Sequence, residues 1–342
     1  MVKKALVCHN AERIPEFIDM AFRYASNGRP GPVYLELPCD VLNAAADMTK
    51  VKQYGSTVVS KSADREAVKK VVDMISEAKK PIIIAGSGAW YSDAGPELTE
   101  LIEKAGLPVF TLNAGRGVVP DTHPLCFESS LAIRPGAALI ANLSTDLVLF
   151  LGSRLSLYYI FGDIFPKDAK FVQVDIEAEE IGRNRKVDLG IVADVKTTVR
   201  EMINVIEERK IGSKLQGQFK EWIETVKKAD VDGKAQAQPM WESASTPIHP
   251  LRLAKEINEF MNREDDIVAA DGGDTATWMG MTRTVRKAGH YLDYGLYGCL
   301  AVGLPYANAA KLINKDKRVL LVIGDGSVGF NFMEFHTAIR NN

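Results

Sequence analysis

Residues 324–327, with the sequence Gly-Asp-Gly-Ser, directly follow the apolar run 319–323. In an open parallel sheet, ligands bind beyond the carboxyl ends of the strands, and glycine lets the backbone approach a diphosphate closely. An aspartate in such a loop can ligate Mg²⁺ through oxygen. Asp325 is therefore a candidate metal ligand, and an ordinary tight turn is the alternative for so short a motif.

Two other glycine-containing loops follow predicted strands. Residues 271–274 have the sequence Asp-Gly-Gly-Asp, and residues 86–88 have the sequence Gly-Ser-Gly. The second loop is a partial dinucleotide-binding loop, because it lacks the third glycine of G-x-G-x-x-G. Asp175 and Arg154 could complete a nucleotide site with it, and a vestigial or empty site is the alternative.

The elements that must position these loops alternate between helices and strands. Within residues 63–210, short and continuously apolar strands are separated by amphipathic helices, which predicts a parallel sheet covered on both faces. We therefore expect a Rossmann-like central domain. The strands are expected near 81–85, 107–110, 147–151, 171–174 and 189–192, and the helices near 68–75, 95–105, 136–142 and 195–209.

The regions on either side of this domain are each incomplete as α/β domains. Residues 1–42 predict one helix and one strand, at 33–37, which cannot bury a core between them. Residues 43–62 read as a linker, and 211–250 as a second connection that contains a helix and then a polar, proline-containing stretch from 233 onward. The last region, 251–342, predicts helices near 253–261 and 306–314 and strands at 267–270 and 319–323.

Composition excludes several classes of protein. The 342 residues are 46% hydrophobic and 25% charged, with a formal net charge of -2. No positive field is present for nucleic acid or for an acidic membrane surface. No apolar run approaches the ~18 residues of a membrane span. The four cysteines are far apart and form no CxxC pair, which favours reduced thiols and a cytoplasmic protein.

The order of the motifs resembles a known enzyme group. The segments concerned are residues 28–41 (GRPGPVYLELPCDV), 81–88, 172–176 (VQVDI), 298–305 (GCLAVGLP) and 324–327 with Glu334. Together they resemble the thiamin diphosphate-dependent enzymes of the acetolactate synthase, benzaldehyde lyase and 2-hydroxyacyl-CoA lyase group. The resemblance covers nearly the whole chain. It implies that 1–42 is the end of a pyrimidine-binding domain and 251–342 the first half of a diphosphate-binding domain.

The resemblance also implies roles for individual residues. Asp325 would coordinate Mg²⁺, and Gly324, Gly326 and Ser327 would line the diphosphate. Leu300 falls where the group places a bulky apolar residue under the cofactor, within the loop that contains Gly298 and Cys299. The residues expected near the aminopyrimidine or the substrate are Asp271, Gly272, Gly273 and Asp274. The central domain of this group binds FAD, binds ADP or is empty, so its occupant stays open.

Two departures from the group's pattern shape the expected function. The group activates its cofactor through a glutamate early in the pyrimidine-binding domain, and that stretch is expected before Met1. The second magnesium ligand, an asparagine, is not matched by Asn341, which falls inside a predicted helix. We therefore expect an interior piece of a longer enzyme, cut at both ends and inactive alone.

The expected reaction is the formation or cleavage of a carbon–carbon bond next to a carbonyl. The substrate would be a 2-oxo acid, a 2-hydroxy ketone or an acyl-CoA, and the enzyme a homodimer or homotetramer. One alternative is a non-catalytic nucleotide-binding or oligomerisation module built on the central domain. The other is an NAD-dependent dehydrogenase, which rests on Gly86 and Gly88 alone.

Overall fold

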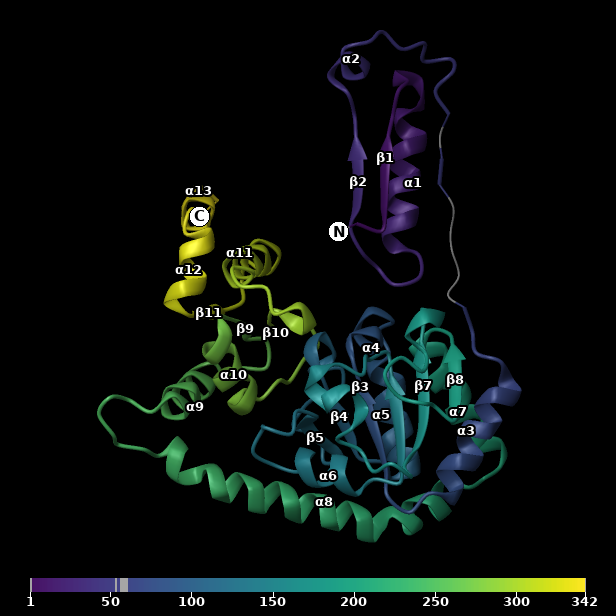
Figure 1. Ribbon diagram of the computed structural model, residues 1–342, viewed down its shortest axis with the longest axis vertical. Coiled ribbons are helices and arrows are strands. Elements are labelled where there is room, and N and C mark those ends of the chain that lie inside the picture. The colour runs from purple at the N-terminus through teal and green to yellow at the C-terminus, as the bar shows by residue number, and fades with distance from the viewer. Residues whose placement is uncertain (1, 53, 56–60, 342) are drawn as a thin grey trace. The chain divides into compact units, whose positions relative to one another are not determined.

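The computed structural model describes residues 2–52, 54–55 and 61–341. The chain divides into two compact units, residues 1–61 and 62–342. The predicted linker at 43–62 includes residues 53 and 56–60, which lie outside the described part of the chain. Figure 1 shows the elements of both units.

The first unit is a single β-α-β motif. Strands β1 (Lys4–Val7) and β2 (Val33–Glu36) pair in parallel, and helix α1 (Ile14–Ser26) connects them. Helix α2 (Cys39–Leu42) follows β2. The sequence predicted α1 and β2 but not β1, whose four residues hold one buried side chain, Leu6.

The second unit begins with the central sheet, whose six parallel strands have the order β5-β4-β3-β6-β7-β8. This is the doubly wound order of dinucleotide-binding folds, with its reversal point between β3 and β6. The expected Rossmann-like domain is thus confirmed. The strands are β3 (Pro81–Ala85), β4 (Val109–Thr111), β5 (Cys126–Ser129), β6 (Leu147–Leu151), β7 (Lys170–Asp175) and β8 (Leu189–Val192).

Helices cover both faces of this sheet and bury two separate apolar clusters (Figure 1). One face carries α3 (Arg65–Glu77), α5 (Gly95–Ala105) and α7 (Val195–Glu208), which pack on one another. The other face carries α6 (Ala138–Ser144) and the middle of α8. Short helical segments follow several strands: α4 (Ser87–Tyr91), η2 (Asn113–Gly115), η3 (Leu157–Gly162) and η4 (Ala178–Glu180).

Helix α8 (Gly212–Trp241) corrects the sequence prediction. The stretch from 233 was expected to be a linker, but the helix continues through Gly233 and Pro239 to Trp241. Ala237 is buried, and Lys234 pairs with Glu128 and Asp230, so tertiary contacts hold the helix where its local sequence disfavours it. None of the described helices combines the length and hydropathy that a bilayer span requires.

The last part of the unit is a three-stranded parallel sheet with the order β10-β9-β11. The third apolar cluster of the unit packs between this sheet and helices α9 and α10. Its elements are α9 (Pro250–Phe260), β9 (Ile267–Asp271), α10 (Gly273–Thr282), β10 (Tyr291–Leu292), η5 (Gly295–Tyr297), α11 (Gly303–Ile313), β11 (Val319–Ile323), α12 (Asp325–Asn331) and α13 (Glu334–Arg340).

Candidate functional site

The loops after β9 and β11 meet at one edge of the three-stranded sheet. The two strands pair in parallel with Ile323 opposite Asp271, so the residues that follow them leave the sheet side by side. The Gly324 N–H donates to the Asp271 carbonyl oxygen at 3.1 Å. The structure therefore brings together the two glycine loops that the sequence singled out in this region.

Gly272 makes this close approach possible. Its φ is +89°, a conformation that L side chains rarely adopt. A Cβ added there would lie 3.1 Å from the Gly324 nitrogen and 3.2 Å from the Ser327 Cβ. The two loops are thus packed backbone to backbone.

Asp271 is completely buried beneath these loops. Its Oδ2 accepts a hydrogen bond from the Gly303 N–H at 2.7 Å, at the first turn of α11. Its Oδ1 has no hydrogen-bond partner among the described residues. A buried carboxylate oxygen without a partner carries a desolvation cost, and such groups concentrate at functional sites.

The outer side of the same edge is open. Asp325 and Gly326 are exposed in the first turn of α12, whereas Ser327 is buried. A Cβ added to Gly326, Gly273 or Gly298 would meet no described atom within 4 Å. A ligand with several oxygens would therefore find room beside the Asp325 carboxylate.

The loop 294–302 crosses this edge and is fixed at both ends. The Asp293 carboxylate accepts from the Gly295 N–H at 2.9 Å, and burial raises the pKa of this carboxyl. Tyr158 of the central domain donates to the Gly295 carbonyl oxygen at 3.4 Å, and burial raises the pKa of its phenol to about 12. Between these anchors and Ala301, Leu300 is 42% exposed.

Ser327 uses its side chain inside the protein. Its Oγ accepts from the Ala301 N–H at 2.8 Å, and Asn331 donates to the Ala301 carbonyl oxygen at 2.8 Å. Neither Ala301 nor Asn331 was predicted from the sequence as a residue of this site. Their only signal in the sequence is the four-residue spacing of Ser327 and Asn331, which places both on one face of a helix.

The described residues contain no group of three or more His, Cys, Asp or Glu side chains arranged around a metal. Asp325 therefore supplies a single carboxylate. Asn341 directly follows α13 as its C-cap residue, and its amide donates to the Thr337 carbonyl oxygen at 2.8 Å. Glu334 begins α13, and its carbonyl oxygen accepts from Asn308. Asn342 lies outside the described residues.

The glycine loops of the central sheet pack closely on one another. Gly88 donates to the Gly152 carbonyl oxygen at 2.8 Å, and a Cβ on Gly88 would lie 2.6 Å from the Gly152 Cα. The Gly86 loop thus packs directly on the loop after β6. Arg154 pairs with Glu180 at 3.4 Å, and the Asp175 carboxylate accepts from the Glu177 N–H. All of these contacts lie within the central domain, and they leave its occupant open.

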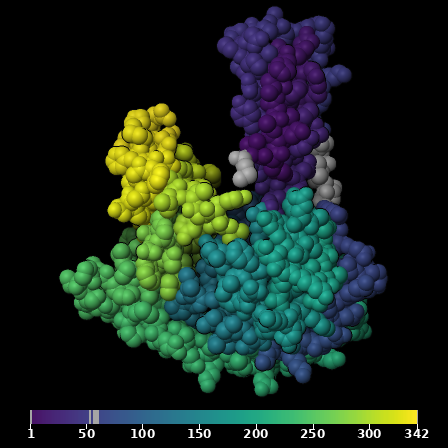
Figure 2. Space-filling view, in the orientation of Figure 1, coloured from purple at the N-terminus to yellow at the C-terminus, as the bar shows by residue number. Residues whose placement is uncertain are grey.

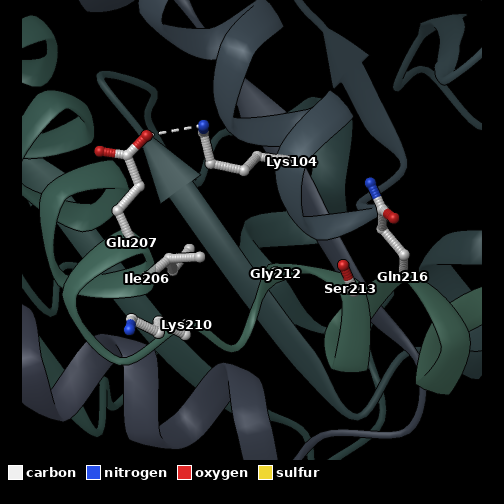
Figure 3. A pocket seen from close by; sticks show the side chains of 7 residues that line it. All are labelled: Lys104, Ile206, Glu207, Lys210, Gly212, Ser213 and Gln216. Atoms are coloured by element: carbon white, nitrogen blue, oxygen red, sulfur yellow. Dashed lines mark hydrogen bonds and ion pairs between the residues drawn. The ribbon is translucent and has the colours of Figure 1, made fainter.

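A surface pocket of about 340 Å³ lies elsewhere, between α5, α7 and the start of α8 (Figure 3). Its side chains include Lys104, which pairs with Glu207 at 2.7 Å. Because α5 and α7 run back along the sheet, their carboxyl ends lie at the amino edge of the strands. This is the edge opposite to the one where α/β sheets bind ligands.

Comparisons with known proteins identify the family to which the chain belongs. Residues 68–202 match the thiamine pyrophosphate enzyme central domain, and residues 271–342 match the C-terminal TPP binding domain of the same enzymes. The two matches together include well over half of the chain. The chain belongs to the thiamine pyrophosphate enzymes. The match to the C-terminal TPP binding domain begins at Asp271, so it includes both loops of the candidate site.

Individual relatives are similar over nearly the whole chain. A probable acetolactate synthase large subunit from Methanococcus aeolicus is 31% identical over 98% of the chain. The 2-hydroxyacyl-CoA lyase 1 of Mus musculus is 31% identical over 97%, and the oxalyl-CoA decarboxylase of Escherichia coli (strain K12) is 29% identical over 94%. The matched part is 59%, 56% and 56% of these three relatives, respectively.

Proposed function

We propose that the carboxyl edge of the β10-β9-β11 sheet binds thiamin diphosphate through Mg²⁺, with Asp325 as the metal ligand. Gly324, Gly326 and Ser327 would line the diphosphate. The rest of the cofactor would lie near Asp271, Gly272, Gly273, Asp274, Gly298, Cys299 and Leu300. The observation that carries this proposal is the exposed Asp325 carboxylate beside open space, at the point where both glycine loops leave the sheet.

The donor set suits magnesium bound to a diphosphate. Mg²⁺ in such sites takes one or two carboxylates, and phosphate oxygens and waters complete its octahedron. A single exposed aspartate is therefore sufficient from this side. The buried Asp271 Oδ1 has no hydrogen-bond partner among the described residues. A ligand atom or a bound water that donated to it would reduce its desolvation cost.

The proposed reaction is the formation or cleavage of a carbon–carbon bond next to a carbonyl. When bound, thiamin diphosphate supplies an electron sink for the carbanion that such reactions require. The residues of this chain would hold the diphosphate, support the cofactor from below through Leu300, and fix the 294–302 loop through Asp293 and Tyr158. The substrate would be a 2-oxo acid, a 2-hydroxy ketone or an acyl-CoA, as the names of the relatives suggest.

We further propose a cytoplasmic homodimer or homotetramer. By resemblance, the cofactor is activated by a glutamate of the pyrimidine-binding domain. None of the acidic residues of 1–42 corresponds to that glutamate. The 342-residue chain is therefore expected to bind Mg²⁺ and thiamin diphosphate without turning over substrate alone.

Calorimetric titration of the 342-residue chain with thiamin diphosphate tests the proposal. We expect uptake that requires Mg²⁺, and at least a tenfold loss of affinity, about 1.4 kcal/mol, in Asp325→Ala. Asp316→Ala is the matched control, because Asp316 is an exposed carboxylate near the amino end of the same strand, β11. Binding of thiamin diphosphate that does not depend on Mg²⁺, or an equal loss of affinity in both variants, would refute the assignment of Asp325.

A further inference from the structure

Ala301 has an unusual backbone conformation beside the candidate site. Its φ is +77°, in the left-handed region, where a Cβ is unfavourable. It is 8% exposed and immediately follows Leu300. A residue other than glycine stays in this conformation only where its surroundings fix it.

Helix α12 provides that fixation from two consecutive turns. Ser327 Oγ accepts from the Ala301 N–H, and Asn331 Nδ2 donates to the Ala301 carbonyl oxygen, each at 2.8 Å. Both backbone groups of one residue are thereby bound by side chains four positions apart on the same helix. Two residues later, the Gly303 N–H is bound by Asp271.

We propose that Asn331, with Ser327, forms a latch that holds Ala301 in its left-handed conformation and thereby positions Leu300 to support the thiamin part of the cofactor. This inference rests on the proposed function. Asn331 is a positioning residue, because it acts through Ala301 and Leu300. Loss of the latch should therefore weaken the binding of the thiamin part of the cofactor and leave the binding of its diphosphate unchanged.

Asn331→Ala is the informative variant, since Ser327 is itself proposed to line the diphosphate. Asn308→Ala is its matched control. Asn308 also donates its side-chain amide to a backbone carbonyl, that of Glu334 at 2.9 Å, and it is also half-buried. Its bond joins α11 to α13 and does not involve the 294–302 loop.

Hydrogen exchange of the unliganded chain tests whether the latch exists. Asn331→Ala removes the hydrogen bond to the Ala301 carbonyl oxygen, so Ala301 should leave its left-handed conformation more often. We therefore expect the Ala301 amide, which donates to Ser327, to exchange about three- to tenfold faster in this variant. Its exchange rate should be unchanged in Asn308→Ala. Equal rates in Asn331→Ala and the unmodified chain would overturn the proposal. If Asn331→Ala does not fold, Asn331→Asp replaces it, because aspartate keeps the size but lacks the donor.

Titration with two ligands in the presence of Mg²⁺ tests what the latch does. Asn331→Ala should bind thiamin diphosphate about three- to tenfold more weakly and inorganic pyrophosphate as tightly as before. Adding Ala301→Gly should recover most of the lost affinity, because glycine adopts positive φ without strain. An equal loss for both ligands, or the same loss in Asn308→Ala, would overturn the role in positioning.

The two proposals fail in different ways. If the unmodified chain binds neither ligand, the proposed function fails and the cofactor-supporting role of Asn331 fails with it. If it binds both ligands, and Asn331→Ala changes neither affinity, the diphosphate site stands and only the latch is refuted.

Discussion

The two glycines Gly272 and Gly326 lie at the same sheet edge for different physical reasons. Gly272 has a positive φ and faces the backbone of the next loop. Gly326 is in the first turn of α12, with open space where its Cβ would be. Folding therefore requires glycine at position 272, whereas glycine at position 326 leaves room for a ligand.

Substitution by alanine separates these two roles. We expect Gly272→Ala to lower the free energy of unfolding by about 1–3 kcal/mol, because the new Cβ is strained and crowded. Gly326→Ala should leave the free energy of unfolding nearly unchanged and weaken Mg²⁺-dependent thiamin diphosphate binding about tenfold or more. Urea unfolding and calorimetry measure the two quantities. Similar stability losses in both variants would contradict this assignment.

At the scale of single residues, a sequence predicts candidate residues more readily than the contacts that they make. Asp325 is a candidate because it follows an apolar strand in a parallel sheet; the structure shows that strand and an exposed Asp325, and its role as a metal ligand stays a prediction. The hydrogen bond between Ser327 and Ala301 was not predictable, because it joins residues 26 positions apart through the path of an irregular loop. No local pattern encodes such a pairing.

Among the elements, α8 shows how far tertiary contacts override local preference. Glycine and proline disfavour helix interiors, so the sequence predicted an end near Gly233. In the structure, Gly233 lies against the chain at Gly136: an added Cβ would be 2.6 Å from the Gly136 nitrogen and 2.8 Å from its carbonyl oxygen. The glycine that suggested a linker is therefore explained by close packing of the helix.

Two glycines inside α8, Gly217 and Gly233, allow a direct comparison. Gly217 is exposed, and an added Cβ would meet no described atom within 4 Å. Gly217→Ala should stabilise the protein by about 0.5–1 kcal/mol through helix propensity. Gly233→Ala should destabilise it by about 1–3 kcal/mol through overpacking. Thermal and urea unfolding would measure both, and stabilisation by both substitutions would show that the contact with Gly136 is not tight.

Strands with continuous apolar runs were predicted within a few residues, because burial on both faces leaves a strong signal. Strand β5 was missed. Its four residues include Glu128, which is buried only because Arg134 and Lys234 pair with it. Burial of a charge through distant partners cannot be read from a short segment.

At the scale of the second unit, hydrogen bonds made by buried, ion-paired side chains join the central domain to the last three-stranded sheet and its helices. Arg116 pairs with Asp121 at 2.5 Å and donates to the Arg283 carbonyl oxygen at 3.0 Å. Asp121 also accepts from the Val285 N–H at 2.6 Å. Arg134 donates to Glu128 and, at 2.6 Å, to the Gly280 carbonyl oxygen. These contacts hold the last turn of α10 and the segment that follows it.

The Glu128 carboxylate makes this junction sensitive to acid. Its burial raises the pKa, but Arg134, Lys234 and Arg116 outweigh burial and hold the pKa at about 2. The folded-state pKa is thus below the unfolded value near 4.5, so the stabilisation is complete above that pH and is lost as the pH falls toward 2. Glu128→Gln should be about 3 kcal/mol less stable than the unmodified chain at pH 7.

Urea unfolding between pH 2 and 7 measures this dependence. The difference between Glu128→Gln and the unmodified chain should narrow as the pH falls from about 5, while Glu66→Gln, at an exposed site, should track the unmodified chain throughout. A difference that stays constant over this range would show that the charge of Glu128 does not stabilise the junction.

Strand β11 has one consequence for how the molecule behaves in solution. It is an edge strand of five apolar residues, all half-buried, paired on one side with β9. An edge of this kind offers a ready template for intermolecular β-pairing, and natural proteins usually blunt such edges with charges, proline or a covering element. We therefore expect the 342-residue chain, handled by itself, to self-associate more readily as its concentration rises.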